Sequence, residues 1–229
     1  MPTSAPRTAR AIARRELTDA IVTSARRQLA EIGPAALSVR AVARDLGMAS
    51  SAVYRYFPSR DELLTELLVI FYGELADLLE AADAGCARDD LRERWLTLGR
   101  TLRSWALATP HEYALLFGSP VPGYAAPPRT VEPAGRVAGV LIALMRDADE
   151  RGPLSERSPM PPTTHALYEG LRSAAEVDLS DEATVRALTA WGGLFGSISL
   201  ELFGHLHRTV TDYDAHFALV LDRLDPIRP

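Results

Sequence analysis

The chain has 229 residues, 47% of them hydrophobic, and a formal net charge of -5. This composition supports a packed core in one or two domains and argues against an intrinsically disordered chain. Its single cysteine, Cys86, excludes an internal disulfide, and no apolar run approaches the roughly 18 residues that cross a bilayer. Because the first residues also lack the hydrophobic segment of a signal peptide, we expect a soluble cytoplasmic protein without a membrane span.

Charge is segregated along the chain. Residues 1–60 carry ten arginines and four acidic residues, a net charge of +6, whereas residues 61–229 carry 15 arginines and 26 acidic residues, a net charge of -11. Arginine is common throughout this lysine-free chain, so the segregation of sign is more informative than the arginine count. A basic first quarter on an acidic body is typical of a head that binds a polyanion.

The first quarter is predicted to contain three helices after a disordered start of about 12 residues. Apolar residues keep helical spacing from Arg14 to Ile32, and Gly33-Pro34 ends that helix. A second short helix begins after Ser38, which can cap it, and ends at Gly47, which suits a left-handed turn.

A third helix follows Gly47 and stops before Pro58, because a proline disfavours helix at the residue before it. Val53, Tyr56 and Phe57 repeat there at three and four residues, with Phe57 expected in the core. Two helices joined by a tight glycine turn form a helix-turn-helix, which fits the major groove of DNA.

The body is predicted to be helical as well. Ser59 and Glu62 form a capping box that opens a long helix to about Gly85. Helices are then expected at about 89–108, a short one after Pro110, and, beyond a proline-rich loop, at about 131–150, 164–177, 181–206 and 213–224. No alternating strand pattern appears, so the fold class is all-α, with an N-terminal three-helix helix-turn-helix domain and a larger helical domain.

Two segments resemble a known family. LSVRAVARDLGMASSAVYRYFPSRDELL resembles the DNA-binding domain of the TetR family of transcriptional repressors over roughly residues 14–65, with turn, recognition helix and next capping box in register. Ala49 stands where relatives usually have a capping serine or threonine, so Ser50 or Ser51 is expected to cap the recognition helix instead. We divide the chain into a flexible basic arm (1–13), the helix-turn-helix domain (14–60) and a helical ligand-binding and dimerisation domain (61–229).

The body shows a second resemblance. EYALLFGSPVPGYAAPPRT and, further on, WGGLFGSISLELFGHL are similar to the ligand-binding domain of the subgroup named for a Trp-His-Gly signature. This chain reads Trp191-Gly192-Gly193 at that place. No role of the missing histidine in relatives is therefore carried over.

The resemblance implies a DNA-binding surface. Tyr54 and Tyr56 would donate their hydroxyls to phosphates, and Arg60 would pair with another phosphate. The helix that begins at Ser38 can present backbone N–H groups to a phosphate, and Arg40 is expected on a phosphate or a guanine edge. The leading turn of the recognition helix, expected to face the bases, consists of Ser50, Ser51 and Ala52. Four arginines form either a DNA-contacting arm or a soluble tail: Arg7, Arg10, Arg14 and Arg15.

One recognition helix offers little specificity, so a two-fold dimer on a palindromic operator is expected. The predicted dimer surface combines small residues, which let a second helix approach, with apolar ones of the last helix: Gly192, Gly193, Gly196, Ser197, Phe217 and Leu221. TetR-like proteins pair such helices as a four-helix bundle. Close packing within one subunit is the alternative explanation for the glycines.

The remaining helices are predicted to enclose a pocket for an unidentified small molecule. Its aromatic candidates are Trp95, Trp105, Tyr113, Phe117, Tyr168 and Phe195, and its polar candidates are His111, His165, Glu169 and His205. Each aromatic residue is also an ordinary core candidate. No cofactor or metal is expected, because His205 and His207 at i, i+2 point to different faces of a helix.

These patterns predict a homodimeric, ligand-responsive transcriptional regulator, a repressor released from its operator by a small molecule, and not an enzyme. The alternative is a DNA-binding architectural or protein-docking module without an effector. A helical enzyme with a vestigial head is a third hypothesis, but the sequence holds no phosphate loop or nucleophile elbow.

Overall fold

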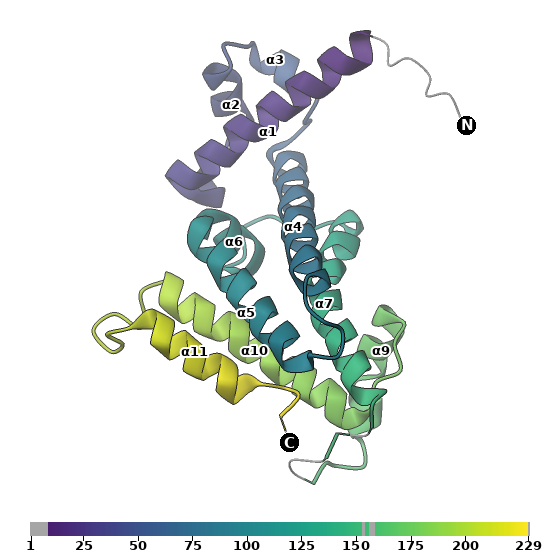
Figure 1. The fold of residues 1–229 in the computed structure, drawn as a ribbon. Coiled ribbons are helices and arrows are strands. Elements are labelled where there is room, and N and C mark those ends of the chain that lie inside the picture. Colours follow the sequence, from purple (N-terminus) through teal and green to yellow (C-terminus); the bar gives the residue numbers. More distant parts are fainter. Residues whose placement is uncertain (1–8, 153, 156–158, 229) are drawn as a thin grey trace. The chain divides into compact units, whose positions relative to one another are not determined.

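The computed structural model describes residues 9–152, 154–155 and 159–228 (Figure 1). Throughout these residues the regular structure is helical and no strand occurs, which confirms the all-α fold class. The chain divides into two compact units, Met1–Phe71 with His111–Thr130 and Tyr72–Pro110 with Val131–Pro229. None of the helices in the described ranges is long and apolar enough to span a membrane.

The first unit contains helix α1, Ala9–Ala36, followed by α2, Val39–Asp45, and α3, Ser50–Val53. Helix α1 begins at Ala9 rather than at Arg14, because the alanines of this segment are strong helix formers. Residues 9–13 are therefore helical, although they fall in the predicted flexible arm, and Arg7 lies outside the described residues. At Gly33 the backbone leaves the helical region (φ 73°, ψ 171°), where the sequence predicts the helix to end.

The core formed by α1, α2 and α3 comes from the predicted apolar faces. Buried residues are Ile21, Ala25 and Leu29 of α1, Val39, Val42 and Ala43 of α2, and Val53 and Phe57 around α3. Ile32, expected on the same face of α1, is 51% exposed. The buried apolar face of α1 therefore ends before Ile32, the residue that precedes the break at Gly33.

Three further elements contribute to the first unit: the first half of α4, Arg60–Ala84; α6, Pro110–Phe117; and the 3-10 turn η1, Pro128–Thr130. The Ser59 hydroxyl accepts a hydrogen bond from the Glu62 amide at 3.1 Å, so the predicted cap of α4 is present. Arg26 of α1 pairs with the buried carboxylate of Glu112 at 3.1 Å and lies over the Phe71 ring. These contacts tie α6 and α4 to α1.

The second unit contains the rest of α4 and six helices: α5, Leu91–Ala108; α7, Val131–Asp149; α8, Thr164–Leu167; α9, Glu169–Ala175; α10, Asp181–Leu202; and α11, Tyr213–Leu224. Asp90 caps α5 by accepting from the Glu93 amide at 2.9 Å. Trp95, buried in the second turn of α5, donates from Nε1 to the backbone oxygen of Leu221 at 2.9 Å. Figure 1 shows α10 and α11 side by side in this unit.

Two boundaries in the second unit differ from the sequence prediction. The helix expected at 164–177 is interrupted at Tyr168. Near this break the buried side chain of Arg172 donates a hydrogen bond to the backbone oxygen of His165. Helix α10 ends at Leu202 rather than near Leu206, because Gly204 adopts a left-handed conformation (φ 76°).

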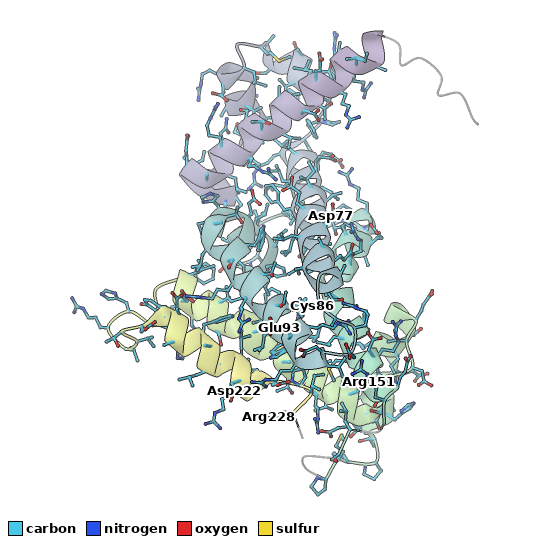
Figure 2. The ribbon with its side chains drawn as sticks, in the orientation of Figure 1. Asp77, Cys86, Glu93, Arg151, Asp222 and Arg228 are labelled. Atoms are coloured by element: carbon cyan, nitrogen blue, oxygen red, sulfur yellow. The ribbon has the colours of Figure 1, made fainter. Side chains whose placement is uncertain are left out.

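The C-terminal segment is tied to α10 and α11. Asp222 and Arg228, both labelled in Figure 2, form an ion pair at 2.8 Å. The nearly buried Arg186 of α10 donates to the backbone oxygens of Pro226 and Arg228, at 3.2 and 2.7 Å. These bonds satisfy carbonyl groups that would otherwise lack partners after the last helix.

Candidate nucleic-acid interface

The turn between α2 and α3 has the geometry of a helix-turn-helix. Gly47 adopts the left-handed conformation (φ 66°) and its amide donates to Arg44 O at 3.1 Å, while Met48 N–H donates to Ala43 O at 2.8 Å. These two bonds end α2 as a glycine C-cap does. Ala49 then stands in extended conformation at the N-cap of α3, without a side-chain cap.

Both serine caps predicted in this segment are absent. Ser38 holds the N-cap position of α2 in extended conformation, but its side chain makes no capping hydrogen bond. Ser50 and Ser51 belong to α3 itself, since the chain turns into the helix directly after Ala49. A residue inside the first turn cannot take the N-cap role, because the cap needs a non-helical backbone.

Most of the predicted contact residues are accessible. Arg40, Ser51 and Tyr54 are exposed, with Tyr54 at 38%, and Ser38 is half-buried. The remaining half-buried members are Ser50, Ala52 and Tyr56. The guanidinium of Arg14 on α1 lies 5.6 Å from the centre of the Tyr56 ring, so one predicted arm residue adjoins this surface.

Two arginines that the sequence analysis did not select belong to the same segment. Arg44, in the last turn of α2, and Arg55, just after α3, are both exposed. Neither makes an ion pair within the described ranges, and the same holds for Arg40. Both lie inside the helix-turn-helix segment of the basic first quarter, and that position could have identified them from the sequence.

Arg60, predicted as a phosphate ligand, is engaged within the protein. Its Nε donates to Leu37 O at 3.2 Å, and its Nη2 donates to Pro34 O at 2.8 Å and Ala35 O at 3.2 Å. Its side chain is 29% exposed. The structure therefore brings it to the junction between α1 and α2.

Asp45 holds α2 against α1. Its Oδ2 accepts from Ser24 Oγ at 2.5 Å and from the Arg27 guanidinium. The hydrogen bond from Ser24 holds the pKa of Asp45 below its ordinary value, and Arg27 acts in the same direction against the opposing effect of desolvation. The carboxylate thus stays charged at neutral pH, beside arginines that face outward.

The predicted dimer residues separate into an interior and an exposed set. Phe217 and Leu221 lie inside the chain, 4% and 1% exposed, because α11 packs on α5. Gly193 is also explained within the chain, since a Cβ there would lie 2.6 Å from Leu224 Cδ1. Gly192 and Gly196 are exposed, and a Cβ at either would meet no atom within 4 Å.

An apolar surface continues from these glycines. Leu200 and Phe203 at the end of α10 and Leu219 on α11 are 45%, 47% and 63% exposed. An open groove of about 370 Å³ lies between the two helices, lined by Gly193, Ser197, His216, Leu219, Val220, Arg223 and Leu224. We call this groove with Gly192, Gly196, Leu200 and Phe203 the α10–α11 face.

The predicted aromatic lining is divided between the units. Tyr113 and Phe117 of the first unit are neighbours, with ring centres 5.4 Å apart. In the second unit Phe195 packs on Trp191 at 4.5 Å, and Trp95 is a core residue. Trp105 and Tyr168 are half-buried. A common lining by these six residues stays a prediction.

An apolar hollow lies elsewhere in the second unit. It has a volume of about 90 Å³ between α7, α9 and α10, and its walls are Ala138, Leu141, Ile142, Leu171, Leu179, Ala187, Leu188 and Trp191. Of the polar candidates, His165 pairs with Asp181 at 3.1 Å, and Glu169 and His205 are exposed. Among the described residues no group of three or more histidine, cysteine or acidic side chains is placed to hold a metal ion.

A helix-turn-helix whose arginines are exposed, and make no ion pair among the described residues, defines a DNA-binding protein of the helix-turn-helix class. Residues 21–67 match the model of bacterial regulatory proteins of the tetR family, and residues 95–224 match that of the tetracyclin repressor-like C-terminal domain. The chain therefore belongs to the tetR family of DNA-binding transcription regulators. The Trp-His-Gly subgroup stays a prediction.

Individual relatives agree with this assignment. The chain is 41% identical over 196 residues to the HTH-type transcriptional regulators Mb1846 of Mycobacterium bovis and Rv1816 of Mycobacterium tuberculosis, covering 84% of this chain and 83% of each relative. The crystal structure of SCO4313, described as a regulatory protein, superimposes with a TM-score of 0.79 at 35% identity, covering 96% of this chain and 98% of that one. These relatives are regulators, a non-enzymatic class.

Proposed function

We propose that the protein is a ligand-responsive repressor that binds a palindromic operator as a homodimer and is released by a small molecule. The observation that carries the proposal is the set of exposed side chains on α2, on α3 and directly after α3: Arg40, Arg44, Ser51, Tyr54 and Arg55. Arginines without acidic partners neutralise phosphates, which supplies most of the affinity for duplex DNA. The side chains of α3 then select the bases.

Dimerisation is supported by the α10–α11 face. It is open and apolar, and its two exposed glycines allow another helix to approach closely. Exposed apolar surface of this kind marks interaction sites in soluble proteins. A second copy seated there by a two-fold axis would place two reading heads on two half-sites.

Ligand response is supported by the apolar hollow between α7, α9 and α10, which would receive an apolar group. Its volume of about 90 Å³ is smaller than a typical ligand pocket, so a drug-sized molecule must widen it. A ligand that binds better to one arrangement of the heads shifts the population toward that arrangement. Such a shift would release the operator.

DNA binding is tested with double-stranded fragments that the wild-type protein selects from a random-sequence pool. We expect Tyr54→Ala and Arg40→Ala to weaken binding about tenfold each while circular dichroism stays unchanged. The control is Arg100→Ala, which removes one exposed charge from α5 in the second unit and is expected to bind as wild type. Unchanged binding by both head variants would refute the proposed surface.

The Arg40 variant also decides between its two expected targets. Loss of a phosphate contact lowers the slope of log affinity against log salt by about 0.9, whereas loss of a guanine contact relaxes the preference at one base position. Release of the fragment by compounds that also raise the melting temperature tests the effector. Intact DNA binding without any such compound would favour the architectural module.

A further inference from the structure

The first residue of α4 reaches back to the junction between α1 and α2. Arg60 directs Nε and Nη2 at three backbone oxygens, those of Leu37, Pro34 and Ala35, at 2.8 to 3.2 Å. Its Nη1 faces the exposed carboxylate of Asp61 at 3.7 Å. The guanidinium is thus occupied from three sides by its own chain.

Two of those carbonyls, Pro34 O and Ala35 O, belong to the last residues of α1, and Leu37 O lies just beyond its end at Ala36. The backbone leaves the helical region there (φ 73°, ψ 171°), so the last residues of α1 are separated from its regular part. Within the junction, the Leu37 amide makes a long bond of 3.4 Å to Pro34 O. Carbonyls at a helix end attract cationic donors, and Arg60 supplies one from the next long helix.

We propose that Arg60 is a positioning residue for DNA binding, which fixes the α1–α2 junction to the start of α4, and not a phosphate ligand. These hydrogen bonds fix the direction in which α2 leaves the junction. They thereby fix the orientation in which α3 meets the DNA. This inference rests on the proposed binding of DNA through α2 and α3. It replaces the phosphate contact that the family resemblance implies for this arginine.

Lysine distinguishes the two roles. A lysine at position 60 keeps the positive charge that a phosphate would accept, but one ammonium group cannot reproduce a planar fork on three carbonyls. Arg60→Gln removes the charge as well. Arg55→Lys and Arg55→Gln are matched controls, because Arg55 is exposed and makes no ion pair among the described residues.

The experiment measures three quantities on the full chain: affinity for the selected fragments between about 50 and 200 mM salt, the melting temperature, and hydrogen exchange of residues 34–46 without DNA. We expect Arg60→Lys to bind about tenfold more weakly with an unchanged salt slope, to melt several degrees lower, and to exchange faster at the junction. Arg55→Lys keeps the charge and should keep the wild-type salt slope, melting temperature and exchange at the junction, whereas Arg55→Gln should lower the salt slope without lowering the melting temperature.

Two results would overturn the proposal. One is wild-type affinity, melting and exchange in Arg60→Lys. The other is a fall in salt slope of about 0.9 per contact in Arg60→Gln with unchanged melting and exchange, which identifies a phosphate ligand. If the wild-type protein selects no DNA, the proposed function fails, and the DNA-binding part of this inference fails with it. The melting temperature and hydrogen exchange would still show whether Arg60 holds the junction.

Discussion

Asp45 couples the stability of the head to pH. Its carboxylate is hydrogen-bonded to Ser24 and paired with Arg27, so its pKa in the folded chain lies below that in the unfolded chain. The stabilisation is therefore complete above the unfolded pKa of about 3.9 and is lost as the pH falls through the lower folded value.

Replacing Asp45 by asparagine removes this dependence. We expect the difference in unfolding free energy between wild type and Asp45→Asn to be constant above about pH 5 and to shrink below about pH 4. Urea unfolding at a series of pH values measures it. A difference that grows on acidification would contradict the assignment of the paired carboxylate.

Gly47 is needed for its backbone conformation rather than for space. Its φ of +66° is left-handed, and a Cβ would meet no atom within 4 Å. We expect Gly47→Ala to lower the unfolding free energy by about 1 kcal/mol, from backbone strain alone. Gly73→Ala in α4 is the control, since that glycine is helical with equal space and its replacement should be neutral or stabilising. Chemical denaturation of both variants would reveal a steric origin if Gly73→Ala were equally harmful.

At the scale of elements, one buried arginine joins three helices. Arg94 of α5 is fully buried and pairs with Asp83 of α4 at 2.8 Å and Asp147 of α7 at 2.6 Å. Desolvation raises the pKa of Asp83, but the hydrogen bonds from Arg94 and Arg88 together lower it below its ordinary value.

Removing this cation takes away the buried charge between Asp83 and Asp147 and leaves each with a largely exposed arginine partner, Arg88 and Arg146 respectively. We expect Arg94→Leu to cost about 3 kcal/mol of unfolding free energy, as for other buried ion pairs that lose one partner. Arg100→Leu, whose partner Glu93 is exposed, should cost less than about 1 kcal/mol. Equal losses in thermal or urea unfolding would show that burial of Arg94 is not what matters.

The α10–α11 face gives a prediction about assembly. Leu219 is 63% exposed at its centre, so Leu219→Asp should leave the fold intact but place a charge in the proposed dimer interface. Sedimentation is expected to change from dimer to monomer. Leu78→Asp on α4, at 42% exposure, is the control and should remain dimeric. A dimeric Leu219→Asp protein would place the interface elsewhere.

Local signals explain which elements the sequence predicted well. Gly33 and Gly47 mark left-handed backbone, and the Ser59 cap marks the start of α4; all three are properties of a few neighbouring residues. The break at Tyr168 coincides instead with a hydrogen bond from the Arg172 side chain to the backbone oxygen of His165, seven residues earlier. Such a contact leaves no periodic trace in the sequence.

The same distinction applies to the candidate sites. Helix α11 has apolar residues on more than one side, so spacing alone did not show that Phe217 and Leu221 face inward while Leu219 faces outward. Likewise the position of Arg60 was clear from its motif. Its bonds to carbonyls more than 20 residues earlier required the folded junction.

At the scale of the whole molecule, the chain combines a helix-turn-helix head with a helical body that carries an open apolar face. The head supplies the reading surface, and dimerisation would double it. A small molecule can act on such a protein only through its differential affinity for the arrangements of the two heads. Operator binding and dimerisation are therefore expected to fail together.

The most direct test is selection of DNA by the full chain from a random-sequence pool, followed by sequencing of the bound fragments. We predict one enriched motif with two inverted half-sites separated by about one helical turn, or a multiple of it. Tyr54→Ala should no longer enrich it. Failure to enrich any motif, or enrichment of a single half-site without inverted symmetry, would contradict a dimeric operator-binding regulator.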